Sequence, residues 1–286
     1  MTKVLSRFLV FLLAVLAVVT VALTLFYFLR SEEVFSFSQG KDDNLIRYVN
    51  TGETLDVTVY RSNASANTYT LVSSDDTIIK FKEKVSDNIF RFEAAAAKGG
   101  SAEIKLQTSN TKYADLSLTV RVGNGTKAYP YFVRNYTDFA NVGKTDKFTL
   151  DSNYLQVADI DMRVATEAWT PIGDSSHYFE GTYNGNGHNI NNFAMIEEDS
   201  ATGGNEDVSA KSFAALFAAV GKDGVVSRIN LNKVTIDGSF DVAAAVACSS
   251  KGAIQFITVK ELSINNAKAD SISAGIVGEA VAGVFD

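Results

Sequence analysis

A 13-residue pattern that occurs twice without a gap places the strongest constraint on the fold. GVVSRINLNKVTI begins at Gly224, and GAIQFITVKELSI begins 28 residues later at Gly252. Both copies place apolar, often β-branched residues among polar ones, as strands do. A unit this short cannot bury its apolar face alone, so we expect successive units to stack.

A third copy is predicted upstream, where apolar residues again stand at positions 0, +3 and +5. We align Ile190, Phe193 and Met195 with Val226, Ile229 and Leu231 of the second copy and with Ile254, Ile257 and Val259 of the third. The loop 197–210, which contains Glu197, Glu198, Asp199, Glu206 and Asp207, would absorb the extra length as a solvated segment.

Strands repeating every 25–30 residues favour a parallel β-helix. Asn at the turns tolerates a left-handed backbone, and its amide can form ladders along the stack. We place Asn230, Asn232, Asn265 and Asn266 near such corners. The alternatives are a β-sandwich and a Rossmann-like domain, but the latter needs long helices, and 212–220 is the one helix-like candidate. A short helix is also expected at 136–142, with Thr137 as N-cap.

The region from about residue 128 onward resembles the GLUG-type β-helix of bacterial surface proteins and of the non-catalytic region of IgA-cleaving metallopeptidases. The resemblance rests on YLQVADIDM, WTPIG, YFEGTYNGNGHNI and FAALFAAVGKDG, in that order. FAALF and VAAAVAC carry Ala where the family often has Gly, which indicates a diverged turn of the coil. The resemblance implies a right-handed, pectin-lyase-like coil over residues 124–286, and a truncated coil is one expectation for this chain.

The stretch 168–193 concentrates Trp, Pro, His and Gly, and two interpretations compete for it. We expect architecture rather than a ligand site. Trp169 and Phe179 would cap the apolar end of the coil. Gly185 and Gly187 would form a tight corner, with His188 bonded to the backbone there.

Residues 34–123 predict a separate β-sandwich. The segments 55–60, 77–81, 89–94, 101–108 and 116–122 mostly alternate apolar and polar residues, and turn-forming residues lie between them. TGETLDVTV, SSDDTIIKF, AKGGSAEIKLQT and LSLTVRV together resemble a group 2 bacterial Ig-like domain, which implies a spacer or adhesion module. Residues 122–130 would be the linker to the next domain.

Residues 8–29 form an uncharged apolar run of 22 residues, long enough to span a bilayer as a helix. Lys3 and Arg7 precede it, so the positive-inside rule keeps residues 1–30 as a cytoplasmic stub with a signal anchor. We expect one pass and an extracellular C-terminal ectodomain. A cleaved signal peptide is the alternative.

The charge and the motifs exclude several classes of function. The net charge of −7 argues against a nucleic-acid partner. Cys248, the one cysteine, cannot form an internal disulfide and is expected to be buried. GNG at 185–187 lacks the spacing of a phosphate loop, and His177 and His188 form no HExxH motif.

Calcium binding is a minor hypothesis. Asp159 and Asp161 stand two apart on one expected strand, and Asp151 could join them, because carboxylate oxygens suit calcium. The resemblance instead places them in a structural strand. We therefore predict no catalytic, metal or cofactor-binding residue.

The sequence as a whole predicts a non-catalytic, membrane-anchored surface protein for adhesion or binding of an extracellular protein or polysaccharide. Two alternatives remain open. One is the N-terminal, non-catalytic part of a larger surface metallopeptidase. The other is a β-helix carbohydrate-active enzyme, which would align acids on one sheet face.

Overall fold

The computed structural model describes residues 15–16, 18–21, 35–37, 45–61, 68–109, 116–197 and 212–281. Most of the predicted span 8–29 lies outside these residues. Of its described part, residues 15–16 and 18–21 are helical. No helix among the described residues is both long and apolar enough to cross a membrane. The rest of the described chain is all-β, apart from the helices α2 (Tyr136–Ala140) and η2 (Met162–Val164).

Residues 35–123, here called the N-terminal module, form two main sheets around one core. The first sheet has the order β2-β9-β8-β5, and the second has the order β3-β7-β6. All of these strand pairs are antiparallel except β2–β9, which is parallel. The bounds are β1 Phe35–Ser36, β2 Ile46–Asn50, β3 Thr54–Thr58, β4 Tyr60–Arg61, β5 Tyr69–Ser73, β6 Ile79–Lys84, β7 Ile89–Ala94, β8 Gly100–Thr108 and β9 Ser117–Gly123.

The alternation of buried and exposed side chains along the strands explains why the sheets of this module pack around one core. In β8 the residues are buried and exposed in turn, so one face packs on the core and the other meets solvent. The five predicted segments all contain strands, but β6 begins two residues later than predicted. Its expected first residue, Thr77, lies in a turn where its N–H donates to Asp75 Oδ1 at 2.9 Å. Strands β2 and β5 were not predicted.

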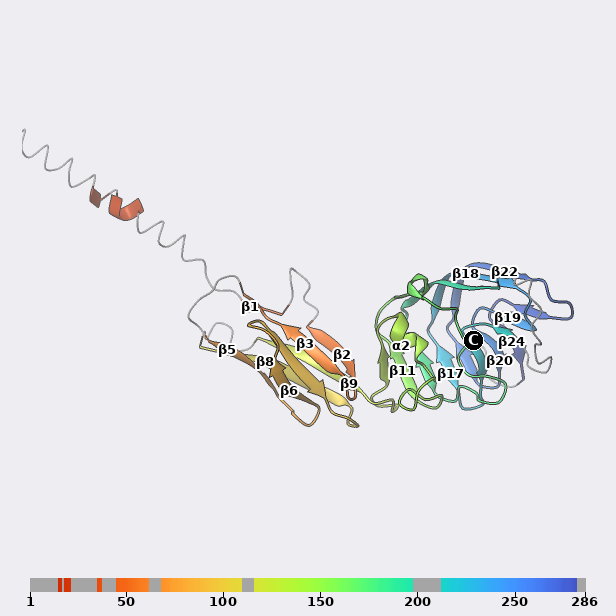
Figure 1. Cartoon of the computed structure of the whole chain (residues 1–286), viewed down its shortest axis with the longest axis horizontal. Coiled ribbons are helices and arrows are strands. Elements are labelled where there is room, and N and C mark those ends of the chain that lie inside the picture. The colour runs from red at the N-terminus through yellow and green to blue at the C-terminus, as the bar shows by residue number, and fades with distance from the viewer. Residues whose placement is uncertain are drawn as a thin grey trace, which may run out of the picture.

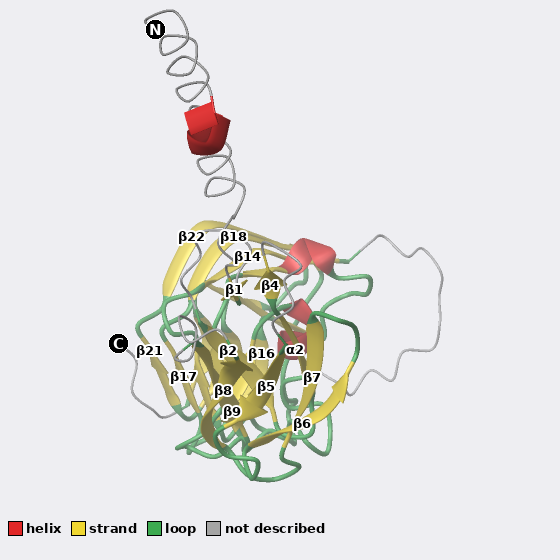
Figure 2. Ribbon diagram, turned by 90° about the vertical axis from the view of Figure 1, so that its left-hand side faces the viewer, coloured by secondary structure: helices red, strands yellow, loops and turns green. Residues whose placement is uncertain are grey.

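Residues 124–281, here called the C-terminal module, form four sheets in which every strand pair is parallel. The orders are β10-β11-β13-β17-β21, β12-β14-β18-β22, β15-β19-β23 and β16-β20-β24. Successive circuits of the chain therefore add strands to the same sheets, and Figure 2 shows β14, β18 and β22 side by side. The bounds are β10 Tyr131–Val133, β11 Asn153–Gln156, β12 Ile160–Asp161, β13 Thr182–Asn184, β14 Asn189–Ile196, β15 Phe213–Ala214, β16 Phe217–Val220, β17 Val225–Ser227, β18 Asn230–Gly238, β19 Val242–Ala244, β20 Ala247–Ser250, β21 Ala253–Gln255, β22 Thr258–Asn266, β23 Ile272–Ala274 and β24 Val277–Ala280.

The strand register confirms the alignment of the second and third sequence copies but corrects the first. Val226 lies beside Ile254, and Leu231 beside Val259, as predicted. Ile190, however, pairs with Leu231 and not with Val226. The error arose because the 0, +3, +5 spacing occurs twice in each circuit. Asn192 in β14 has a left-handed backbone, so the inward side chains on either side of it stand three residues apart and not two. The same 0, +3, +5 spacing therefore recurs at this point of the circuit.

Three local predictions need correction. The N-cap of α2 is Asn135, whose side chain accepts from Asp138 N, and not Thr137. The helix-like segment 212–220 forms the strands β15 and β16. The left-handed positions belong mainly to residues other than Asn, and three of them lie within strands and not at corners. Among the described non-glycine residues they are Asn186, Asn192, Arg228, Lys233, Phe256, Glu261 and Asp270. The four predicted corner asparagines, Asn230, Asn232, Asn265 and Asn266, lie in β18 and β22.

The 168–193 stretch contributes layers to the stack. Ile172 bridges to Phe217 and Phe179 to Val220, both in parallel. Phe179 is fully buried, and its ring lies between those of Tyr154 in β11 and Phe217 in β16, at 6.2 and 5.2 Å, so it lies within the core and does not cap its end. Trp169 stacks on Phe139 of α2 with ring centroids 4.9 Å apart, and its Nε1 donates to Ala215 O at 3.1 Å.

Candidate functional site at the junction of the two modules

Each of the three predicted calcium residues is engaged by a protein donor, which for Asp151 is the Thr149 hydroxyl. Asp159 accepts from the backbone and side chain of Asn189, both at 2.9 Å, and these bonds lower its pKa. Asp161 pairs with Arg163 at 2.6 Å and accepts from Asn192 at 2.9 Å. No group of three or more His, Cys, Asp or Glu able to hold a metal occurs among the described residues.

The two histidines contact separate carboxylates. His188 bonds the backbone at the corner, as expected, because its N–H donates to Gly185 O at 2.9 Å, and its ring Nδ1 lies 3.2 Å from Asp159 Oδ1. His177 Nδ1 lies 3.0 Å from Asp174 Oδ2 on an exposed turn. These two pairs belong to different turns of the chain. Of the predicted acidic loop, residues 198–210 lie outside the described residues, and Glu197 accepts from Ser239 N at 2.7 Å.

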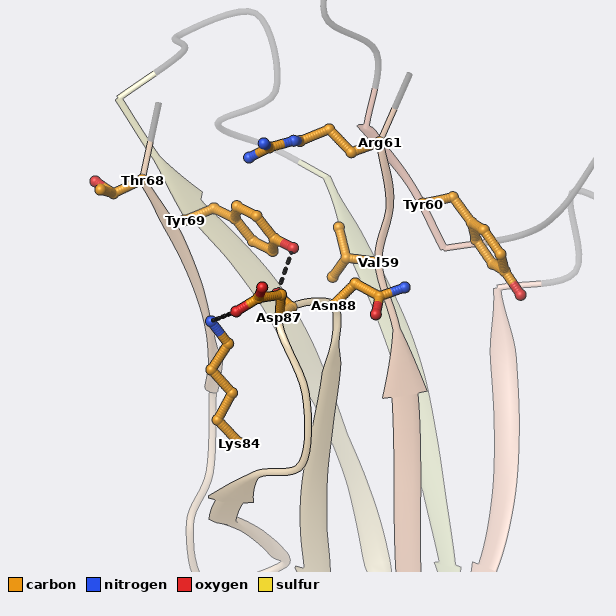
Figure 3. A pocket seen from close by; sticks show the side chains of 8 residues that line it. All are labelled: Val59, Tyr60, Arg61, Thr68, Tyr69, Lys84, Asp87 and Asn88. Carbon is orange, nitrogen blue, oxygen red and sulfur yellow. Dashed lines mark hydrogen bonds and ion pairs between the residues drawn. The ribbon is translucent and has the colours of Figure 1, made fainter. Parts of the chain in front are cut away.

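A pocket of about 500 Å³ opens in the N-terminal module (Figure 3). It is lined by Val59, Tyr60, Arg61, Thr68, Tyr69, Lys84, Asp87 and Asn88. Tyr69 donates its hydroxyl to the Asp87 carbonyl at 2.8 Å, and Lys84 pairs with the Asp87 carboxylate at 3.5 Å. The lining therefore holds one carboxylate, already paired, and not the two that acid–base hydrolysis of a glycoside uses.

The junction between the two modules contains a buried polar side chain whose hydrogen bonds cross from one module to the other. Asn50 ends β2 in the N-terminal module and is 0% exposed. Its Oδ1 accepts from Phe132 N at 2.7 Å, and its Nδ2 donates to Phe132 O at 3.1 Å. Phe132 lies in β10, the first strand of the C-terminal module. One side-chain amide thus satisfies both backbone groups of a residue in the other module, as a neighbouring strand would.

An ionic network lies beside this amide. Arg134 donates to both carboxylate oxygens of Glu53 at 2.8 and 3.2 Å, and to Asp138 at 2.7 Å. Burial opposes its charge, but the bonds and charges of Asp138 and Glu53 outweigh burial and raise the Arg134 pKa. Arg134 therefore links the N-terminal module to α2 with bidentate geometry, which is the stronger form of ion pair.

A lysine and an aromatic pair complete the junction. Lys147 donates to the Thr51 carbonyl at 2.6 Å, and burial lowers its pKa. The rings of Tyr48 and Phe132 lie 4.8 Å apart across the junction. Contacts of three kinds, amide, ionic and aromatic, therefore cross between the modules.

The predicted linker, 122–130, is folded against both modules. Asn124 N donates to Tyr129 O at 2.8 Å, and Asn153 N of β11 donates to Gly125 O at 2.8 Å. A Cβ on Gly123 would lie 2.2 Å from the Pro130 carbonyl oxygen, so glycine is needed for this close approach. Gly123 and Gly125 therefore form part of a tight turn and not of an open linker.

Sequence reasoning did not identify the junction residues. Asn50 precedes Thr51 and Gly52, which is an ordinary turn signal. Its partner Phe132 is 82 residues away, and a single sequence contains no sign of that contact. A single sequence likewise does not reveal which carboxylates Arg134 will meet.

No family model matches the chain. In an alignment 168 residues long, which covers 56% of this chain and about 2% of the other protein, the chain is 32% identical to halomucin of Haloquadratum walsbyi. The crystal structure of a proposed immunoglobulin A1 protease from Bacteroides ovatus aligns with 57% of this chain and 57% of its own. The TM-score is 0.34 and the identity is 18%, which is too distant to support an inference.

Proposed function

We propose that the chain is a non-catalytic surface protein, anchored in the membrane by residues 8–29, that displays its C-terminal module for binding extracellular protein or polysaccharide. The observation that carries the proposal is the bonded junction, in which Asn50 and Arg134 hold the two modules together. A rigid junction serves a display protein because it fixes where the distal module points, and so lowers the entropy cost of binding.

We further propose that the C-terminal module is a right-handed parallel β-helix of the GLUG type, and that the N-terminal module is an Ig-like spacer. Support for the first comes from the parallel stacking of four sheets. Support for the second comes from two mainly antiparallel sheets around one core. A β-helix offers a long, flat side surface on which weak contacts add up.

The membrane anchor is supported by the described part of the apolar segment. Val15, Leu16, Val18, Val19 and Val21 are helical and all exposed. Thr20 donates its hydroxyl to the Leu16 carbonyl at 2.7 Å, which satisfies the one polar side chain there within the helix. Exposed valines and leucines of this kind are stable in lipid and unfavourable in water.

Fractionation of cells that produce the full chain tests the proposal. We expect the protein in the membrane fraction, and we expect protease added to intact cells to remove both modules. Leu16→Arg with Val19→Arg should release or mislocalise the protein, because each charge opposes insertion by about 3 kcal/mol. Leu16→Ala with Val19→Ala is the matched control. Recovery of the unaltered protein in the soluble cytoplasmic fraction would refute the proposal.

A further inference from the structure

The first and last long strands of the N-terminal module are neighbours and run in the same direction. Ile46 of β2 lies beside Thr119 of β9, and Asn50 lies beside Gly123. The chain therefore enters β2 at one end of the module and leaves β9 at the other, next to the C-terminal module (Figure 1).

This topology determines how tension acts on the module. A force that pulls the two ends of the module apart slides β2 along β9, so the hydrogen bonds of the ladder carry the load together. A hairpin pulled at its open end instead loses its bonds one at a time. The rate of forced unfolding depends on the barrier that the load must cross. Several bonds that break together form a higher barrier than one bond.

Strand β2 is held along its length and at its end. Backbone bonds beyond the paired residues extend the ladder, from Thr119 N to Leu45 O at 2.7 Å and from Thr51 N to Gly123 O at 2.9 Å. At the end of β2, Asn50 bonds to Phe132, and Arg134 donates to Tyr48 O at 3.3 Å. Tension from the C-terminal module therefore reaches β2 through β10 as well as through β9.

We propose that the N-terminal module is a load-bearing tether, in which β2 is clamped by β9 along its length and by β10 at its end. The proposal rests on the proposed function, in which one end is anchored and the other binds a target. Tension then follows the axis from residue 45 to the junction. The role of the N-terminal module is mechanical, so this module itself needs no ligand; the target is bound by the C-terminal module.

Unfolding of the full chain in detergent under a steadily increasing force tests the clamp, with handles at the two termini. The N-terminal module should unfold at a higher force than when the second handle is moved to Ser109→Cys. That residue follows β8, at the end of the module where β2 begins. The buried thiol of Cys248 does not compete for the handle. Equal forces in the two geometries would overturn the proposal.

Asn50→Ala supplies the second test, in the terminal geometry. Loss of two buried hydrogen bonds should speed unfolding under load about tenfold. Asn88→Ala, at the opposite end of the module, should leave the rate unchanged. An unchanged rate in Asn50→Ala would show that β10 does not share the load. If Asn50→Ala does not fold, the comparison of the two handle positions in the unaltered module still tests the proposal. Since neither test involves the membrane, failure here leaves the surface location standing.

Discussion

The side chain of Asn50 and the backbone of Phe132 are joined by two hydrogen bonds of 2.7 and 3.1 Å that cross from one module to the other. Asn50 is fully buried, so water cannot replace either bond if the amide is lost. These two hydrogen bonds distinguish the chain from a protein whose two modules are joined only by a flexible linker. They also give the most direct prediction.

Asn50→Ala should destabilise the chain by about 2–4 kcal/mol, because the N–H and C=O of Phe132 would remain buried without partners. Chemical denaturation followed by tryptophan fluorescence measures the change, because Trp169 lies in the C-terminal module. The exposed Asn88, replaced by Ala, is the control and should cost little. A similar loss in both variants would mean that Asn50 has no special role.

Leu231→Ala should cost about 2–5 kcal/mol, whereas Leu262→Ala should cost markedly less. The two leucines occupy different layers of the same sheet, and their exposed fractions are 0% and 39%. The same truncation is thus made once in a layer that the next layer covers and once in the last layer that the structure describes. Equal losses in thermal or chemical unfolding would contradict the observed stacking.

Cys248 should resist thiol reagents in the native protein. Burial raises the pKa of its thiol to about 12, so almost no reactive thiolate forms at neutral pH. We expect labelling by a maleimide to be slow without denaturant and fast in it, as followed by intact mass. Rapid labelling of the native chain would show that this part of the fold opens readily.

Asp241 should make stability acid-sensitive. The Lys268 ammonium and the Ser212 N–H lower its pKa from 3.8 to about 2. Because the folded state lowers this pKa, the ionised carboxylate stabilises the folded protein. That stabilisation is complete above pH 3.8 and is lost as the pH falls through about 2. Asp241→Asn should therefore lower the melting temperature at neutral pH. The difference in melting temperature between the variant and the unaltered protein should disappear as the pH falls from 3.8 to about 2. Glu167→Gln, at an exposed carboxylate, is the control; a gap that persists below pH 2 would contradict the prediction.

The sequence predicted the parts of the fold that depend on local periodicity. Alternation located β7, β8 and β9, and the 28-residue repeat located the register of β18 against β22. It misaligned β14, because one left-handed residue, Asn192, produces the same spacing at another point of the circuit. The junction could not be predicted, because Arg134 meets Glu53, and Phe132 meets Asn50, only when the modules pack.

The measurement that tests the central claim most directly is the distance distribution between spin labels in the two modules of the full chain. Lys105→Cys in β8 and Lys260→Cys in β22 are exposed sites for the labels, while Cys248 is buried. A rigid junction predicts one narrow distribution, which broadens when Asn50→Ala is added. A broad distribution in the parent chain, unaffected by Asn50→Ala, would show that the modules move independently and would contradict the account.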